Sequence, residues 1–189
     1  MKIKYKAETT GKAFHRSSAL VRGIRGAIGS GKSVMCVLEL LLLAQKQPAN
    51  AQGIRKSRWG CIRNTYPELK STVIKTFQDW IPDIICPIKY DAPISGKLTM
   101  PLADGTTVEA EFAFLALDKP KDVSKLMSFE FTGIWVNEAQ FVELNIIREA
   151  LSRCGRYPRL AEFEGTGLLP DDFDPSLPKY SDEKHPDYV

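Results

Sequence analysis

The chain lacks the features that mark three broad classes of protein. It has four cysteines in 189 residues and no Cys-x-x-Cys pair, so we expect neither a disulfide framework nor a zinc site. Its longest apolar run, from Cys36 to Ala44, is too short and too interrupted to span a membrane. The lysine-rich N-terminus has no apolar segment of the kind that secretory signals carry. These absences predict a protein of a reducing compartment.

The charge of the chain is too small to indicate nucleic-acid binding by itself. The net charge is +3, and hydrophobic residues make up 43%, which suits one domain with an ordinary core. Many basic residues precede position 26: Lys2, Lys4, Lys6, Lys12, Arg16, Arg22 and Arg25. The stretch from Asp171 onward is acidic. This asymmetry indicates either a polyanion near the N-terminal half or a solvated, lysine-rich end.

One segment matches the phosphate-binding loop pattern GxxxxGK[ST], also called Walker A, at every fixed position. It consists of Gly26, Ala27, Ile28, Gly29, Ser30, Gly31, Lys32 and Ser33. Glycines let the backbone turn tightly, so that N–H groups point into one concavity at the positive end of a helix. In such a loop Lys32 reaches the β- and γ-phosphates of ATP, and the Ser33 hydroxyl binds Mg²⁺.

The residues around this phosphate loop (residues 26–33) favour a nucleotide site over an incidental glycine-rich turn. Residues 19–25 are typical of a short strand, and residues 34–45 are apolar nearly all round, as in a helix packed on a sheet. Strand, loop and helix in this order are the context that the motif requires.

The remainder of the chain alternates strand and helix patterns. The expected elements are a strand at 58–63, a helix capped by Thr65 and Glu68 that stops before Pro82, β structure over 86–118 with a hairpin turn at Asp104-Gly105, a strand at 131–136, and a helix at 141–154 closed by Gly155. This order predicts an α/β fold of three layers with a mainly parallel sheet. Ligands of such folds lie at the carboxyl ends of the strands.

A second candidate motif follows the apolar strand 131–136. Asn137 and Glu138 would lie beside the phosphate loop if the sheet is parallel. Asn137 stands where such strands usually carry an aspartate, so it would hold a metal-bound water without charge. Glu138 is then the candidate general base that polarises the attacking water. The alternative is a strand end with two solvated polar residues.

The chain resembles the ATPase domain of the large terminase subunit of tailed bacteriophages. Four stretches carry the resemblance: residues 26–33, Arg63 to Leu69, Thr132 to Ala139, and Ser152 to Pro158. The resemblance covers about residues 15–160. It implies an ATPase of the ASCE-type P-loop NTPases that uses ATP and Mg²⁺ in the cytoplasm of the bacterial host. It also implies a homo-oligomeric ring on the portal protein, a small terminase subunit as partner, and translocation of double-stranded DNA.

The sequence departs from that family at several site positions. Ile28 stands where many terminases have an arginine, and Arg22 or Arg25 could replace it in part. Lys125 precedes the strand 131–136, where the family often has a basic residue that reaches a neighbour's ATP; the alternative is a solvated lysine. Arg63 or Asn64 is expected to contact the phosphates or Glu138, or else to belong to a solvated helix start.

The expected division of the chain is an ATPase domain at 1–163 and an acidic, proline-rich tail at 164–189. The family's nuclease domain finds no room before Val189, and we interpret Asp171, Asp172 and Asp174 as solvated. The sequence thus leaves three hypotheses open: a DNA motor ATPase, a small-molecule P-loop kinase, and a nucleotide-binding piece without turnover. The arginine-rich lid of such kinases has no evident counterpart.

Overall fold

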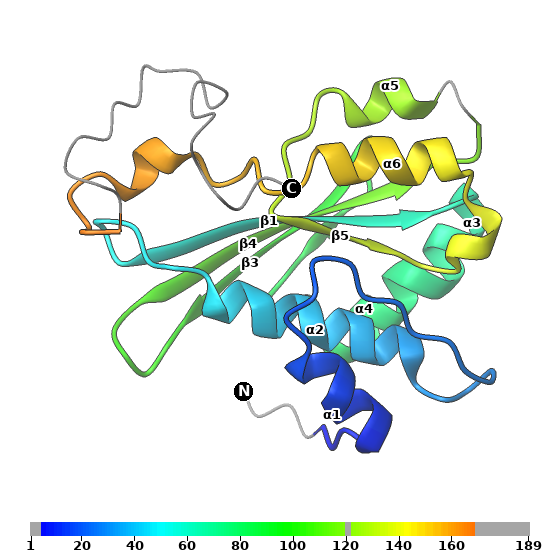
Figure 1. The fold of residues 1–189 in the computed structure, drawn as a ribbon, viewed down its shortest axis with the longest axis horizontal. Helices are drawn as coiled ribbons and strands as arrows, with labels where there is room; N and C mark the ends of the chain where they lie inside the picture. Colours follow the sequence, from blue (N-terminus) through cyan, green and yellow to red (C-terminus); the bar gives the residue numbers. More distant parts are fainter. Residues whose placement is uncertain (1–4, 120–121, 169–189) are drawn as a thin grey trace.

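A mixed five-stranded sheet forms the centre of the computed structural model, which describes residues 5–119 and 122–168 (Figure 1). The strands are β1 (Ile54–Arg63), β2 (Ile88–Lys89), β3 (Ile94–Pro101), β4 (Thr107–Ala116) and β5 (Gly133–Val136), in the spatial order β2-β3-β4-β1-β5. β4, β1 and β5 are parallel, whereas β3 and β2 continue the sheet antiparallel. The core of the sheet is therefore parallel, as the sequence predicts.

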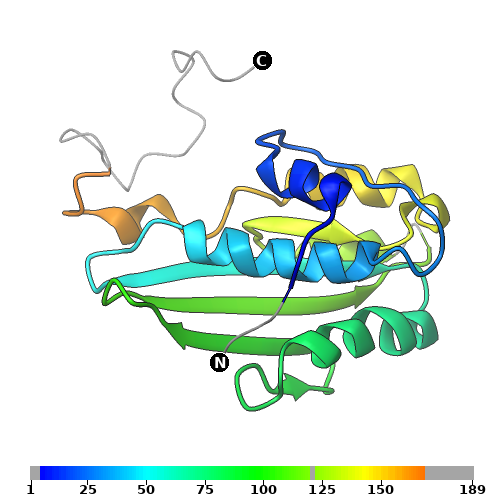
Figure 2. The same cartoon turned by 90° about the horizontal axis from the view of Figure 1, so that it is seen from below.

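Helices cover both faces of this sheet. The helical segments are α1 (Thr9–Arg16), α2 (Lys32–Lys46), α3 (Tyr66–Glu68), the π-helix η1 (Leu69–Ile74), α4 (Lys75–Trp80), α5 (Val123–Leu126), the 3-10 turn η3 (Ala139–Phe141), α6 (Leu144–Ser152) and the 3-10 turn η4 (Leu160–Phe163). α1, α2 and α4 lie on one side of the sheet, and α5 and α6 lie on the other (Figures 1 and 2). The three expected layers are thus present.

Successive side chains of the central strands point to opposite faces of the sheet, and this produces two separate hydrophobic cores. Trp59 and Cys61 of β1 point to the α2 side, whereas Ile62 points to the α6 side. Successive strand residues face opposite sides of a sheet, so a strand covered on both faces must be apolar at every position. On the α2 side Phe77 of α4 packs edge-on against Phe112, with ring centroids 4.7 Å apart. This packing fixes the order of the layers.

The predicted hairpin is confirmed. β3 and β4 pair antiparallel from Pro101 and Thr107 to Ile94 and Phe114. Gly105 in the turn has φ = 83°, a conformation that favours glycine. β1 begins four residues earlier than expected, at Ile54, because it pairs with β4 along its whole length.

The strand predicted at 19–25 is wrong. These residues form no strand, and the side chains of Leu20 and Val21 are 96% and 65% exposed. β5 pairs with β1 along one edge, and no strand of the described residues pairs with its other edge. Residues 19–25 therefore do not pair with this open edge of β5 and remain outside the sheet.

Two helices differ in detail from expectation. The helix after Thr65 ends at Trp80 as predicted but contains the π-helix η1, and the expected capping box is replaced by a side-chain hydrogen bond of 2.9 Å from Thr65 Oγ1 to Glu68 Oε2. The helix expected at 141–154 is the shorter α6, preceded by η3. Gly155 follows it with φ = 72°, in agreement with a glycine that ends a helix.

The cysteines are free thiols, as predicted. Cys61 and Cys86 are buried, and burial raises the pKa of Cys86 to about 12. No cluster of three or more metal-ligating His, Cys, Asp or Glu side chains occurs among the described residues. In the same part of the chain, no helix is both long and apolar enough to cross a membrane. Most of the predicted tail, with Asp171, Asp172 and Asp174, lies outside the described residues.

Candidate functional site

The phosphate loop has the backbone that its glycines predict. Gly29 and Gly31 have φ of 79° and 78°, in the left-handed region that L-residues with side chains rarely adopt. The turn is closed by a hydrogen bond of 3.3 Å from Ser30 N to Ala27 O. α2 begins directly after it, at Lys32. The loop therefore stands at the amino end of a helix of 15 residues, where N–H groups and the helix dipole favour an anion.

Lys32 folds over the phosphate loop. Its ammonium group donates hydrogen bonds of 2.8 and 2.7 Å to the carbonyl oxygens of Gly26 and Ala27. Ile28 is fully exposed at the tip of the loop. The positive charge of Lys32 is thus held against the backbone of the phosphate loop.

The end of β5 lies against the phosphate loop. The Asn137 backbone N–H donates to Ile62 O at 2.9 Å, which anchors this residue to the carboxyl end of β1. Its side-chain amide donates to Ser33 Oγ at 3.4 Å, across 104 residues of sequence. The amino end of α2 and the carboxyl ends of β1 and β5 lie on the same side of the molecule (Figure 1). The structure therefore brings together the two motifs that the sequence singles out.

Glu138 has the backbone conformation expected of a constrained site residue. Its φ of 51° is the only positive value of a non-glycine residue in the described part of the chain. Such conformations are strained and persist where the surroundings impose them. The Glu138 side chain is exposed, and Gln140 Nε2 donates to its Oε2 at 3.3 Å. The carboxylate is accessible to water on the side of the sheet where β5 ends.

Arg63, the last residue of β1, is buried beside the same strand end. Only 6% of it is exposed, and its Nη1 donates to Asn137 O at 3.4 Å. Its Nη2 lies 3.4 Å from Glu68 Oε1, and its guanidinium carbon lies 5.7 Å from the centre of the Phe141 ring. The alternative in which Arg63 is a solvated residue at the start of a helix is therefore wrong, because Arg63 is buried. Glu68 and Phe141 are neighbours that the sequence analysis missed.

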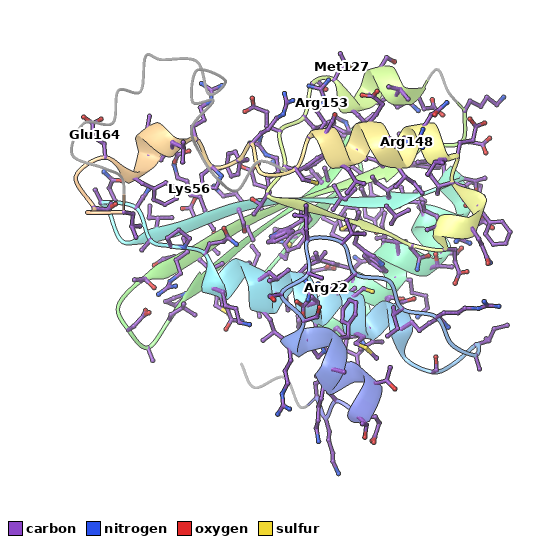
Figure 3. The ribbon with its side chains drawn as sticks, in the orientation of Figure 1. Arg22, Lys56, Met127, Arg148, Arg153 and Glu164 are labelled. Carbon is purple, nitrogen blue, oxygen red and sulfur yellow. The ribbon has the colours of Figure 1, made fainter. Side chains whose placement is uncertain are left out.

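In the structure Arg22 is paired with a carboxylate of α2 and not with the phosphate loop. Arg22 donates to Glu39 Oε1 at 2.6 Å and stacks over the Phe14 ring, between the N-terminal coil and α2 (Figure 3). This ion pair commits its charge to α2. Arg25 is exposed on the coil before the loop. Lys125 lies on α5, where it is exposed and pairs with Asp122 at 2.8 Å.

A buried polar cluster fixes the coil before the phosphate loop to α2. Glu39 is 4% exposed and accepts hydrogen bonds from Arg22 and from His15 Nδ1. His15 Nε2 lies 3.1 Å from the Tyr5 hydroxyl. Burial is tolerated because the carboxylate has two partners. One signal for this cluster was present in the sequence: a lone carboxylate inside an apolar helical run requires a buried partner.

A groove extends from the phosphate loop along β5. Its volume is about 790 Å³, and its polar end contains Lys32, Ser33, Asn137 and Glu138. Its remaining walls are mostly apolar and come from α2, α6 and the coil at 20–24. Cys36 lies in this wall, and burial raises the pKa of its thiol to about 11. The polar end is therefore the part of the groove that suits a charged ligand.

The sequence matches no protein-family model and no curated protein. The structure, however, is similar to structures of the large terminase from a thermophilic bacteriophage. One crystal form has a TM-score of 0.53 and 15% sequence identity, and the match covers 69% of this chain. The complex with ADP has a TM-score of 0.52 and 18% identity, and the match again covers 69% of this chain. The complex with ATP-gamma-S has a TM-score of 0.51 and 15% identity, and the match covers 70% of this chain. This chain spans only 29–30% of the length of those chains.

At such identities the similarity concerns the fold. A mostly parallel sheet core lies between two helical layers, with a glycine-rich loop at the amino end of α2 and a polar strand end beside it. Two of the structures that are similar in fold are complexes of that terminase with ADP and with ATP-gamma-S. The chain therefore has a layered α/β fold with a mostly parallel sheet core, similar to that of these terminase structures, although the strand expected before residues 26–33 is absent.

Proposed function

We propose that this chain binds ATP at residues 26–33 and hydrolyses it as the ATPase domain of a viral DNA-packaging motor. The observation that carries the proposal is the contact of 3.4 Å between Asn137 and Ser33. It joins a phosphate-binding loop to a strand end that carries a metal-site candidate and a carboxylate. Both halves of a nucleotide hydrolase site are needed, because one holds the phosphates and the other orients water.

In this proposal each residue has a separate task. The phosphates are surrounded by the backbone N–H groups of the phosphate loop: Gly26, Ala27, Ile28, Gly29, Ser30, Gly31, Lys32 and Ser33. The ammonium group of Lys32 gives up its hydrogen bonds to two loop carbonyl oxygens and donates to phosphate oxygens instead. Arg63, which contacts the main chain of Asn137, would bind the terminal phosphate. Glu138 is the general base that accepts a proton from the attacking water. The exposed carboxylate of Glu138, on a backbone of positive φ next to the metal-site candidate, supports that role.

The residues present fit a Mg²⁺ ion held mainly by the nucleotide. Ser33 Oγ and the Asn137 side chain adjoin one another, and Glu138 is next in sequence. Mg²⁺ requires oxygen ligands, keeps several waters, and is commonly held by few protein groups together with phosphates. When bound, the ion would neutralise phosphate charge. Asn137 contributes an oxygen without charge, so we expect weak metal binding.

Replacement of Asn137 by Asp tests this metal position. We expect Asn137→Asp to lower the Mg²⁺ concentration for half-maximal ATP turnover by roughly three- to tenfold, as an added charged contact of about 1 kcal/mol would. A Mg²⁺ titration of the turnover rate measures the effect. Asn145→Asp, which adds the same charge on the exposed face of α6, is the matched control. Equal Mg²⁺ requirements in all three proteins would contradict the assignment of Asn137.

The complete site is proposed to form only in a ring. Lys125 is exposed, so it could reach the nucleotide of a neighbouring subunit. Arg25, which is exposed before the phosphate loop, would act within its own subunit in place of the arginine that Ile28 replaces. A charge supplied in trans can be worth about a thousandfold or more in turnover. The partners in this proposal are double-stranded DNA, a portal protein and a small terminase subunit, in the host cytoplasm. Similarity to bacteriophage terminases supports this setting.

Ring assembly predicts a concentration-dependent rate. We expect a mainly monomeric protein in dilute solution with slow turnover, and a turnover per subunit that rises as the protein is concentrated. Steady-state rates, measured together with mass by light scattering, test this. Lys125→Ala should flatten the rise, whereas Lys12→Ala should not. A fast rate that is independent of concentration in a monomeric sample would show that the site is complete in one chain.

A further inference from the structure

Arg63 is a buried cation with weak partners. Its two hydrogen-bonding contacts, to Asn137 O and Glu68 Oε1, are both 3.4 Å long, and its buried Nε has no hydrogen-bond partner. A buried charge is stable only when close partners replace the water it loses. Here the guanidinium retains donor capacity and lies beside the strand end that contacts the phosphate loop. Its position therefore suits an additional anion.

Glu68 connects this cation to an unusual helix. It accepts a hydrogen bond of 2.9 Å from Thr65 Oγ1, and its main-chain oxygen accepts one of 2.6 Å from Thr72 Oγ1. The next residue begins the π-helix Leu69–Ile74, between α3 and α4. π-helices are rare, occur mostly as single turns inside α-helices, and are frequent at functional sites.

The π-helix is in turn embedded in the core. Leu69 and Val73 are fully buried on the α2 side of the sheet, and Phe77 of α4 packs against Phe112 of β4. A change at Glu68 would therefore move packed side chains. This movement of side chains would be transmitted to the sheet and to α2, because a close-packed core has few intermediate arrangements.

We propose that Arg63 is a positioning residue that exchanges Glu68 for the terminal phosphate of bound ATP, and that this exchange alters the helix at 66–74. The inference rests on the proposed nucleotide site and adds its coupling to the fold. A triphosphate carries more charge than one carboxylate. Glu68 is 43% exposed at its side chain, so it returns to water easily when Arg63 leaves. ADP lacks the terminal phosphate and leaves the pair intact.

Hydrogen exchange of the whole chain measures this coupling directly. We compare the free protein with samples saturated in ADP and in the slowly hydrolysed analogue ATP-gamma-S. Both nucleotides should protect the amides of the phosphate loop. ATP-gamma-S alone should accelerate exchange at 66–74, by about threefold or more, because the ion pair that holds the helix start is lost.

The two proposals fail in different ways in this experiment. If neither nucleotide protects residues 26–33, the proposed function is overturned. If both protect the loop and exchange at 66–74 is unchanged, slower, or equally fast with ADP, the exchange of partners is overturned and nucleotide binding stands.

Glu68→Gln provides an independent measurement. Gln keeps an acceptor for Thr65 but removes the charge that competes for Arg63. We expect ATP-gamma-S to bind roughly three- to tenfold more tightly, because one competing ion pair is lost. The affinity for ADP should not change. Arg63→Lys keeps the positive charge but loses the planar guanidinium group that donates two parallel hydrogen bonds. This variant should have a lower preference for ATP-gamma-S over ADP.

Asp79→Asn is the matched control, because it breaks the exposed pair of Lys75 and Asp79 in the same helical segment. It should change neither affinity nor exchange at 66–74. A ratio of the two nucleotide affinities that stays the same in Glu68→Gln and Arg63→Lys would overturn the role of Arg63.

Discussion

Glu138→Gln is expected to bind ATP with unchanged affinity and to lose turnover by roughly a hundredfold or more, the usual size of a general-base effect. The amide fills the same space as the carboxylate and can still accept from Gln140. It cannot accept a proton from the attacking water at neutral pH. Binding is measured by titration calorimetry, and turnover by release of inorganic phosphate under saturating ATP.

A matched control separates the base from general charge effects. Glu143→Gln removes a second exposed carboxylate at the start of α6, five positions along the chain. We expect its turnover to remain close to that of the unaltered protein. Survival of turnover in Glu138→Gln would assign the base to another residue. If the unaltered protein binds ATP but never turns it over, the hypothesis of a binding module is favoured.

Lys32→Ala is expected to weaken ATP binding by roughly tenfold to more than a hundredfold, because charge-assisted hydrogen bonds are worth about 1.5–3 kcal/mol. The methyl group cannot replace the ammonium group that now bonds Gly26 O and Ala27 O. Titration of the variant with ATP and Mg²⁺ gives the change in Kd. An unaltered Kd would remove the phosphate loop from the proposed site.

The control for Lys32→Ala lies at the other end of the same helix. Lys46→Ala removes an exposed ammonium group from the last turn of α2 without changing the loop. Its Kd for ATP should equal that of the unaltered protein. Thermal unfolding of both variants without nucleotide should be similar, which shows that the lost affinity comes from the lost contact.

Local features of the chain were predictable because local chemistry specifies them. The glycines of the phosphate loop adopt positive φ that other residues disfavour, and Gly105 closes its hairpin for the same reason. α2 follows from an apolar run after the loop, and β4 follows from alternation. Asn137 and Glu138 were found because polar residues that end a buried strand lie at the edge where parallel sheets bind ligands.

The strand predicted at 19–25 was wrong because a strand pattern does not by itself place a segment in a sheet. Leu20 and Val21 have such a pattern, but they are exposed on a coil, and the second edge of β5 stays unpaired among the described residues. Similarly, the sequence could not show that Arg22 is committed to Glu39. Two residues 17 positions apart meet only because the coil folds over α2.

The layered α/β class, the phosphate loop, the helix behind it and the polar residues at the end of β5 could all be inferred from the order of the amino acids. These features depend on backbone preference and on periodicity, which neighbouring residues along the chain define. Three others required the folded molecule: the contact of Asn137 with Ser33, the burial of Arg63 between Asn137 and Glu68, and the π-helix after Thr65. The contacts of Asn137 with Ser33 and with Arg63 join residues far apart in sequence that the sheet brings to one edge, so no local pattern encodes them.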